Sequence, residues 1–150
     1  MRIGFATDHR GYELKLKLIE KLTALGYEIK DYGTYSTESV DYPEFAFKLG
    51  KAIVEKYVDF GVAICGSGIG ISIACNKVKG IRCAKVNNSE EAKITRIDNN
   101  SNVVAFGEKI SLENALEIVE TFINTDFSTE EKHHRRVNKI IDYEENNNEW

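Results

Sequence analysis

Short apolar runs alternate with longer segments of helical period along most of this sequence, and that alternation limits the folds open to the chain. Residues 2–6 are typical of a buried strand, and residues 12–25 follow with leucines along one helical stripe before Gly26. Strands that alternate with helices in this way form parallel sheets covered by helices. The sequence therefore predicts a fold of the α/β class.

Five strand-like segments fit the length of the chain. Residues 33–42 form a polar stretch, which leads into a helix whose first turn suits Pro43. A loop of this length is a candidate for function. The expected strands are 2–6, 27–31, 60–65, 81–86 and 103–106, and the expected helices are 12–25, 43–57, 70–76, 89–97 and 112–124.

The C-terminal segment carries a thin apolar edge within a charged stretch. Val137, Ile140 and Ile141 are the apolar residues of a helix expected at about 127–143. An edge this narrow buries little alone but packs well against a partner subunit, so we expect this helix to take part in oligomerisation. Residues 144–150 are expected to fray. Since 42% of the 150 residues are hydrophobic, we expect a single domain over residues 1–150.

Charge and hydropathy exclude several classes of partner. The net charge is −4 and the basic residues are scattered among acidic ones, so nothing resembles the continuous basic face that binds nucleic acid. No apolar stretch approaches the roughly 20 residues of a membrane span, and the apolar start is too short for a signal peptide. We therefore expect a cytoplasmic protein with neither nucleic acid nor a membrane as partner.

The three cysteines give no sign of a disulfide framework or a metal centre. Cys65, Cys75 and Cys83 cannot all pair with one another, and none has the C-x-x-C spacing of a zinc or redox site. We expect reduced thiols and no bound metal. The apolar or helical surroundings of Cys75 and Cys83 favour packing roles for both.

The most informative motif is C-G-S-G-I-G at residues 65–70, a thiol at the end of an expected strand followed by glycines that open a helix. Open α/β sheets bind ligands at this edge. Free N–H groups at a helix start bind anions and favour the thiolate form of Cys65. The motif predicts a reactive thiol beside an oxyanion site. Alternatively, Cys65 is a buried apolar residue and the glycines only form a tight turn.

Other glycine motifs do not fit this segment. The third glycine of a dinucleotide-binding fingerprint would fall on Ile71, and no Lys-Ser/Thr pair follows as in a P-loop. The nucleophile-elbow pattern also fails, because Cys65 and Ile69 occupy its outer positions.

A second polar cluster, D-H-R-G at residues 8–11, again lies between an expected strand and a helix. Its position at the carboxyl edge of the sheet favours ligand binding by Asp8, His9 and Arg10. Asp8 could equally cap the first helix, and His9 and Arg10 could be ordinary solvated residues.

Two more clusters can be interpreted either as ligand-binding residues or as residues with a purely structural role. Residues 96–102 are rich in Asn and Asp, which stabilise turns by bonding to nearby backbone. Lys132, His133 and Arg136 could clamp a phosphate with charge-assisted bonds, or they could form a solvated helix face. His133 and His134 are adjacent, so they point apart and lack the spacing of a metal pair.

Together these motifs resemble ribose-5-phosphate isomerase type B, a family related to the subunits of galactose-6-phosphate isomerase. The resemblance covers residues 2–141 and rests on five ordered blocks. The blocks are D-H-R-G at 8–11, G-T at 33–34 with D-Y-P at 41–43, C-G-S-G-I-G at 65–70, N-K at 76–77 with G-I-R at 80–82, and N-V-V-A-F-G at 102–107.

The resemblance implies a Rossmann-like three-layer α/β/α sandwich with a five-stranded parallel sheet and a C-terminal helix used in oligomerisation. It implies a homodimer or a dimer of dimers with shared active sites. The expected reaction interconverts ribose 5-phosphate and ribulose 5-phosphate through a cis-enediolate. Neither a metal nor an organic cofactor is expected.

The resemblance also implies residue roles. Cys65 is expected to move the proton between C2 and C1, with Ser67 hydrogen-bonded near the thiol and the sugar, and Asn99 to approach from the neighbouring subunit. The remaining expected contacts are Asp8 and Tyr42 with sugar hydroxyls, the N–H groups of Gly66, Gly68, Ile69 and Gly70 with the enediolate oxygen, and His9, Lys132, His133 and Arg136 with the phosphate.

Two positions depart from the family's pattern. Asp98 stands where many members carry the histidine that opens the furanose ring. An aspartate can act as the acid in that step, or opening falls to another group or to the free aldehyde fraction. Lys132 stands where some members have arginine, which keeps the charge but loses bidentate phosphate binding.

Two other functions stay open. One is an isomerase of the same architecture that prefers a hexose phosphate, such as allose 6-phosphate or galactose 6-phosphate, and pocket depth would decide between them. The other is a non-catalytic subunit that binds sugar phosphate. Cys65 and the intact glycine loop weigh against the second.

Overall fold

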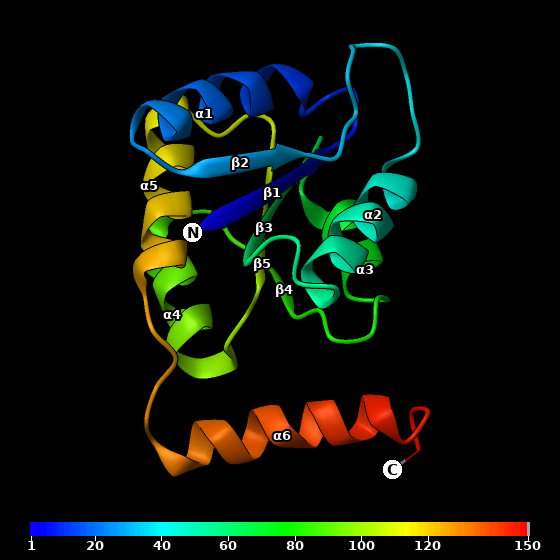
Figure 1. Ribbon diagram of the computed structural model, residues 1–150, viewed down its shortest axis with the longest axis vertical. Coiled ribbons are helices and arrows are strands. Elements are labelled where there is room, and N and C mark those ends of the chain that lie inside the picture. Colours follow the sequence, from blue (N-terminus) through cyan, green and yellow to red (C-terminus); the bar gives the residue numbers. More distant parts are fainter. Residues whose placement is uncertain (150) are drawn as a thin grey trace.

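The computed structural model describes residues 1–149 as five strands and six helices that alternate through β5 and end in two helices (Figure 1). Within residues 1–149, each helix falls short of the length and apolar character that a membrane span requires. The strands are β1 (Arg2–Thr7), β2 (Glu28–Asp31), β3 (Phe60–Cys65), β4 (Cys83–Lys85) and β5 (Val103–Gly107). The helices are α1 (Tyr12–Ala24), α2 (Tyr42–Val54), α3 (Ile69–Cys75), α4 (Ser89–Asn99), α5 (Leu112–Asn124) and α6 (Glu131–Glu145).

All five strands pair in parallel, in the order β2-β1-β3-β5-β4. The three central strands end together, because Thr7 lies opposite Ile64 and Cys65 lies opposite Gly107. Helices α1, α4 and α5 cover one face of the sheet, and α2 and α3 cover the other (Figure 1). The predicted α/β/α sandwich with a five-stranded parallel sheet is confirmed.

Side chains of β3 alternate between two apolar cores, one on each face of the sheet. Val62 and Ile64 pack with the leucines of α1 and with Phe122 of α5. Ala63 and Cys65 point the other way and pack against α2 and α3. This alternation follows from the two-residue period of a strand, and it directs the thiol towards the α2/α3 layer.

Some element boundaries differ from the expected ones for local reasons. Strand β4 is shorter than 81–86, because the Asn102 Oδ1 atom accepts the N–H of Arg82 at 2.8 Å before the strand begins. Helix α2 ends at Val54 rather than 57, and Lys56 then adopts a positive φ of 65°. Helix α4 runs on to Asn99 and ends at Asn100, whose left-handed conformation suits asparagine.

The last helix begins later and ends later than expected. Helix α6 starts at Glu131 and continues through Glu144 and Glu145, where fraying was expected. The Gly80 N–H donates to Glu144 Oε2 at 3.1 Å, and the Asn148 N–H donates to the Tyr143 carbonyl at 2.8 Å. These bonds accompany a helix that extends to residue 145 and hydrogen-bonded turns at residues 146–148, and fraying of the tail stays a prediction. Residue 150 lies outside the described residues.

A fully buried lysine joins α1 to the loop that follows β2. The Lys15 ammonium lies 2.9 Å from Asp31 Oδ1 and also donates to the carbonyl of Thr34. The rings of Tyr12 and Tyr35 lie 5.2 and 5.3 Å from the same ammonium. A buried ammonium is costly unless it is paired, so these contacts are needed in the folded protein. They also hold the beginning of the polar loop at the carboxyl edge of the sheet.

We expect Lys15→Ala to lower the free energy of unfolding by about 2–4 kcal/mol, since it removes the packed stem and leaves Thr34 and Asp31 without their partner. Lys15→Met should cost less because it restores the stem. Lys17→Ala, at an exposed lysine of the same helix, is the control and should stay within about 0.5 kcal/mol of the parent. Urea unfolding of the three variants measures this, and an equal effect of the Lys15 and Lys17 alanine substitutions would contradict it.

Candidate active site

A cavity of about 430 Å³ opens at the carboxyl edge of the sheet, beside the ends of β1, β3 and β5. This is the edge at which open parallel sheets bind ligands. Three of the five motif blocks found in the sequence contribute to it, those at 8–11, 41–43 and 65–70. Its lining residues are Asp8, Arg10, Tyr42, Cys65, Gly66, Ser67, Gly70 and Lys109.

Cys65 is the last residue of β3 and meets the cavity with a side chain that is almost buried, at 4% exposed. The N–H of Gly68 donates to its Sγ atom at 3.2 Å. An N–H directed at sulfur stabilises negative charge on it, and Cys65 also packs into the apolar core between the sheet and α2 and α3. The thiol is therefore neither sealed in the core nor freely solvated.

Two features of the glycine loop require a glycine at residue 68. Gly68 has a φ of 78°, in the left-handed region, and a Cβ there would lie 2.5 Å from the carbonyl carbon of Phe106. Gly68 therefore allows the loop to pack closely against β5 and to turn sharply into α3. The Ser67 hydroxyl accepts the N–H of Ile69 at 3.1 Å and holds the start of that helix.

Tyr42 lies against the glycine loop from the side of α2. A Cβ on Gly70 would come within 2.7 Å of the Tyr42 ring carbon Cζ and 2.8 Å of its hydroxyl oxygen. The absence of a side chain at Gly70 makes this contact possible. The end of the polar loop thereby brings a phenolic hydroxyl to the start of α3, beside the thiol.

Asp8 and His9 hold the turn between β1 and α1. A single oxygen of Asp8, Oδ1, accepts the N–H groups of Arg10 and Gly11 at 3.0 and 3.1 Å, so the capping role considered from the sequence is present. Within the described residues no hydrogen bond reaches its other oxygen, and Asp8 lines the cavity. His9 Nδ1 accepts the N–H of Val40 at 3.2 Å, which leaves Nε2 to donate a hydrogen bond.

The other expected site residues lie elsewhere in the chain. His133 Nε2 lies 3.6 Å from Asp98 Oδ1, and the Lys132 ammonium lies 3.5 Å from Glu130. Helix α4 runs against the strand direction, so its last turn lies at the amino edge of the sheet, near α6 (Figure 1). One chain therefore does not bring this second group to the thiol. The group consists of Asp98, Asn99, Lys132, His133 and Arg136.

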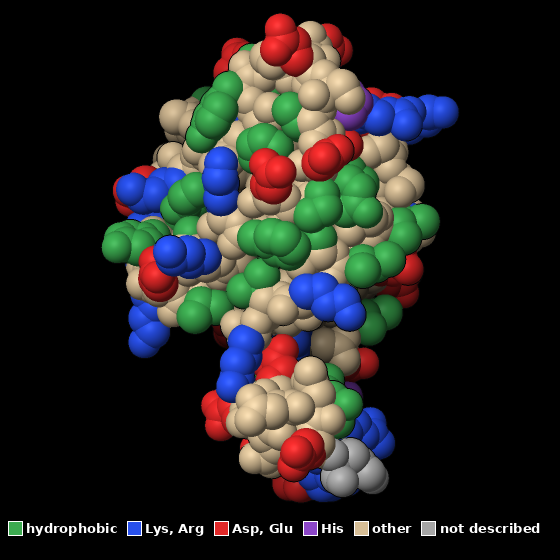
Figure 2. Space-filling model, turned by 90° about the vertical axis from the view of Figure 1, so that its right-hand side faces the viewer, with side chains coloured by type: hydrophobic (Ala, Val, Ile, Leu, Met, Phe, Trp, Pro, Cys, Tyr) green, Lys and Arg blue, Asp and Glu red, His purple; other side chains and the backbone are tan. Residues whose placement is uncertain are grey.

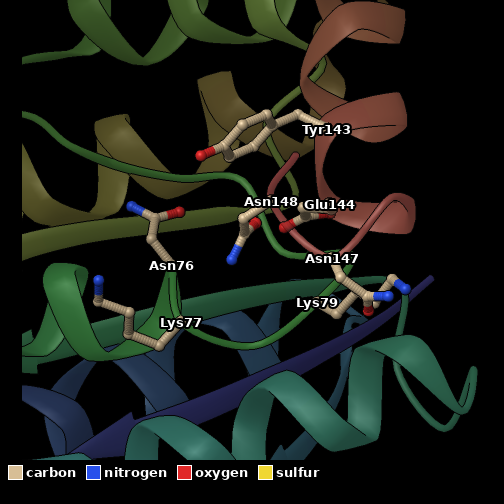
Figure 3. A pocket seen from close by; sticks show the side chains of 7 residues that line it. All are labelled: Asn76, Lys77, Lys79, Tyr143, Glu144, Asn147 and Asn148. Atoms are coloured by element: carbon tan, nitrogen blue, oxygen red, sulfur yellow. The ribbon is translucent and has the colours of Figure 1, made fainter. Parts of the chain in front are cut away.

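A larger cavity, about 510 Å³, lies between α6 and the segment after α3 (Figure 3). Its side chains are amides, ammonium groups, a carboxylate and a phenol, and it contains no thiol or imidazole. We therefore place the candidate active site at Cys65 in spite of the smaller volume there. The residues of the larger cavity are Asn76, Lys77, Lys79, Tyr143, Glu144, Asn147 and Asn148.

The Cys65 cavity contains two cationic residues to which the sequence analysis assigned no specific substrate contact. Lys109 lies two residues beyond β5, and Arg10 was noted in its cluster without a contact being assigned to it. The sequence contained a signal for Lys109, because this residue follows the carboxyl end of a central strand, as Asp8 does. A charged residue there is brought to the same edge whatever its sequence motif.

The remaining cysteines are structural neighbours of one another. Cys75 is fully buried and Cys83 partly buried, and all three thiols of the chain are free. Contact with the Cys75 thiol, together with burial, raises the pKa of the Cys83 thiol well above its usual value. The packing role predicted for both is confirmed. Residues 1–149 contain no group of three or more His, Cys, Asp or Glu placed to hold a metal ion.

Comparison with known proteins agrees with the fold. The ribose/galactose isomerase family matches residues 3–140. A putative sugar phosphate isomerase of Bacillus subtilis, YwlF, is 42% identical, with 98% of this chain and 99% of that protein covered. The structure of Clostridium thermocellum ribose-5-phosphate isomerase B superposes with a TM-score of 0.93 at 44% identity, covering 97% of this chain and 99% of that one.

A further solved structure was determined with a sugar phosphate. Ribose-5-phosphate isomerase B of Mycoplasma genitalium with bound ribulose-5-phosphate has a TM-score of 0.90 at 34% identity, and 96% of each chain is covered. The fold together with these relatives defines an isomerase of the α/β/α sandwich class. This chain belongs to the ribose/galactose isomerase family, and the family resemblance stated from its motifs is confirmed.

We expect Gly68→Ala to destabilise the protein by more than about 3 kcal/mol, because a Cβ there adds a backbone clash with Phe106 to the strain of a positive φ. Gly26→Ala is a matched control, since Gly26 also has a positive φ of 95° but open space around it. It should cost only about 1 kcal/mol. Chemical denaturation measures both, and equal losses would show that the contact with β5 is unimportant.

Proposed function

We propose that this chain interconverts ribose 5-phosphate and ribulose 5-phosphate through a cis-enediolate, with Cys65 as the acid/base. The observation that carries the proposal is the Cys65 thiol at the cavity, with the Gly68 N–H 3.2 Å from its sulfur. The M. genitalium relative with bound ribulose-5-phosphate supports this substrate. The cytoplasmic location expected from the sequence stays a prediction.

The proposed reaction needs one base that reaches two neighbouring carbons. The Cys65 thiolate takes the proton from C2 of the open-chain aldose, and the charge passes to O1, giving the enediolate. A proton moves from O2 to O1, and the thiol returns its proton to C1, which leaves the ketone at C2. The N–H groups of the glycine loop stabilise the oxyanion, and Asp8 and Tyr42 orient the sugar hydroxyls.

The phosphate end of the substrate requires the second group of residues, which a second copy of the chain would supply. We propose a homodimer or dimer of dimers in which Asn99, from the neighbouring subunit, joins the Cys65 cavity. Hydrophobic side chains gather on the face formed by α2 and α3 (Figure 2). Ile69, at the start of α3, is exposed on this face beside the glycine loop, so a partner there would cover the cavity.

In this arrangement Lys132, His133 and Arg136 bind the phosphate together with His9. Asp98 is proposed to open the furanose ring, and its contact with His133 supports the proposal because a carboxylate beside an imidazole can pass a proton. Helix α6 suits an interface, since Ile140 and Tyr143 stay exposed in the single chain while Val137 is buried.

We expect Cys65→Ala to abolish isomerisation, a loss of at least about 10³-fold in kcat, while sugar-phosphate binding survives. Cys83→Ala is the control thiol variant and should keep its activity. The assay follows initial rates on ribose, allose and galactose phosphates, with binding measured by calorimetry. Full turnover by Cys65→Ala would exclude the proposed base, and a preference for a hexose phosphate would replace the substrate while keeping the mechanism.

Shared active sites predict complementation between two inactive chains. Cys65→Ala and Asn99→Ala chains, expressed together in equal amounts, should give about a quarter of the parent activity, because one site in four combines an intact Cys65 with an intact Asn99. Each variant alone and a mixture of separately purified proteins are the controls. Activity no higher than the mean of the two variants would show that each chain builds its own site.

A further inference from the structure

An ion pair crosses the end of β3 at the turn that follows the proposed catalytic thiol. Arg10, from the turn after β1, places Nε 3.1 Å and Nη2 2.9 Å from a single oxygen of Glu108, Oε1. Glu108 follows β5. Since β1 and β5 flank β3 in the sheet, the pair joins the two strand ends on either side of the strand that carries Cys65.

The same two residues contact the turn beneath them. A Cβ on Gly66 would lie 2.9 Å from Arg10 Nη1 and 3.0 Å from its Cζ, so the guanidinium lies directly on the glycine. The Glu108 N–H donates to the carbonyls of Cys65 and Gly66 at 3.0 and 3.3 Å. The Cys65–Gly66 turn is therefore held by the guanidinium on one side and by the Glu108 backbone on the other.

Global stability does not account for this arrangement. The Arg10 side chain is 55% exposed and that of Glu108 25%, and ion pairs this accessible to water contribute about 0–1 kcal/mol. Local positioning explains it better, because a shift of about 1 Å in a catalytic group can lower turnover by up to about 100-fold. The backbone N–H of Arg10 also donates to the Asp8 carboxylate. A change at this pair would therefore affect both the Asp8 turn and the Cys65–Gly66 turn.

We propose that Arg10 and Glu108 form a strap, meaning the ion pair that spans β3, and that this strap holds the Cys65–Gly66 turn in its reactive geometry. Both are positioning residues rather than catalytic ones. The inference rests on the proposed role of Cys65 as acid/base. It adds a requirement that none of the sequence motifs indicates: the ends of β1 and β5 must be joined across β3.

The first test is steady-state kinetics with ribose 5-phosphate. Arg10→Ala and Glu108→Gln should each lower kcat about tenfold and leave KM within about twofold, and the double variant should be no worse than either. Arg10→Lys, which keeps the charge but not the planar cover of Gly66, should fall between. Arg2→Ala is the matched control, since Arg2 pairs with Asp59 at 3.4 Å at the amino edge of the sheet and should leave kcat and KM unchanged.

The second test does not depend on isomerisation. Alkylation of Cys65 by iodoacetamide, followed over a range of pH by mass spectrometry of its peptide, should be several-fold faster in Arg10→Ala and Glu108→Gln than in the parent. Arg2→Ala should react like the parent. If the parent fails to isomerise the sugar but the alkylation rates change as expected, the proposed function is wrong and the strap still stands.

Two results would overturn the strap. One is a rise in KM with unchanged kcat for Arg10→Ala but not for Glu108→Gln, which would make Arg10 a direct substrate contact. The other is parent-like kcat and parent-like alkylation of Cys65 in both variants. Circular dichroism of each variant checks that the fold is retained before either result is read.

Discussion

Parallel pairing of β1, β3 and β5 is the constraint on which the candidate site depends. Because the three strands end together at one edge, residues far apart in the sequence, Asp8, Cys65 and Lys109, line one cavity. The register also decides which way the thiol points. A slip of one residue in β3 would turn Cys65 from the α2/α3 layer towards the opposite core, away from the glycine loop that follows it.

The same topology separates two sets of polar residues. The thiol, the glycine loop and the sugar-binding candidates lie at the carboxyl edge, whereas the end of α4 and helix α6 carry Asp98, Asn99 and the basic cluster at the other edge. Helices that return antiparallel to their strands make this separation unavoidable within one chain. The proposed homodimer or dimer of dimers would bring the two sets together and would cover the exposed apolar face of α2 and α3.

Local patterns predicted much of the fold and part of the site. Helical stripes, strand alternation and turn residues act over a few neighbours, so α1, β3 and the glycine loop could be located from the sequence. Boundaries were less accurate where distant side chains intervene, as at β4, where Asn102 binds the backbone before the strand begins. The extension of α6 also depends on a distant contact, between Glu144 and Gly80.

The sequence by itself determined the alternation of strands and helices, the thiol at a strand end and the glycines beside it, because each depends on the conformational preferences of adjacent residues. Only the tertiary structure decided that Arg10 meets Glu108 above Gly66, that Lys15 is buried against Asp31, and that Asp98 lies far from the thiol. Those facts depend on which strands are neighbours. Strand order results from the packing of the whole chain, and no short segment contains it.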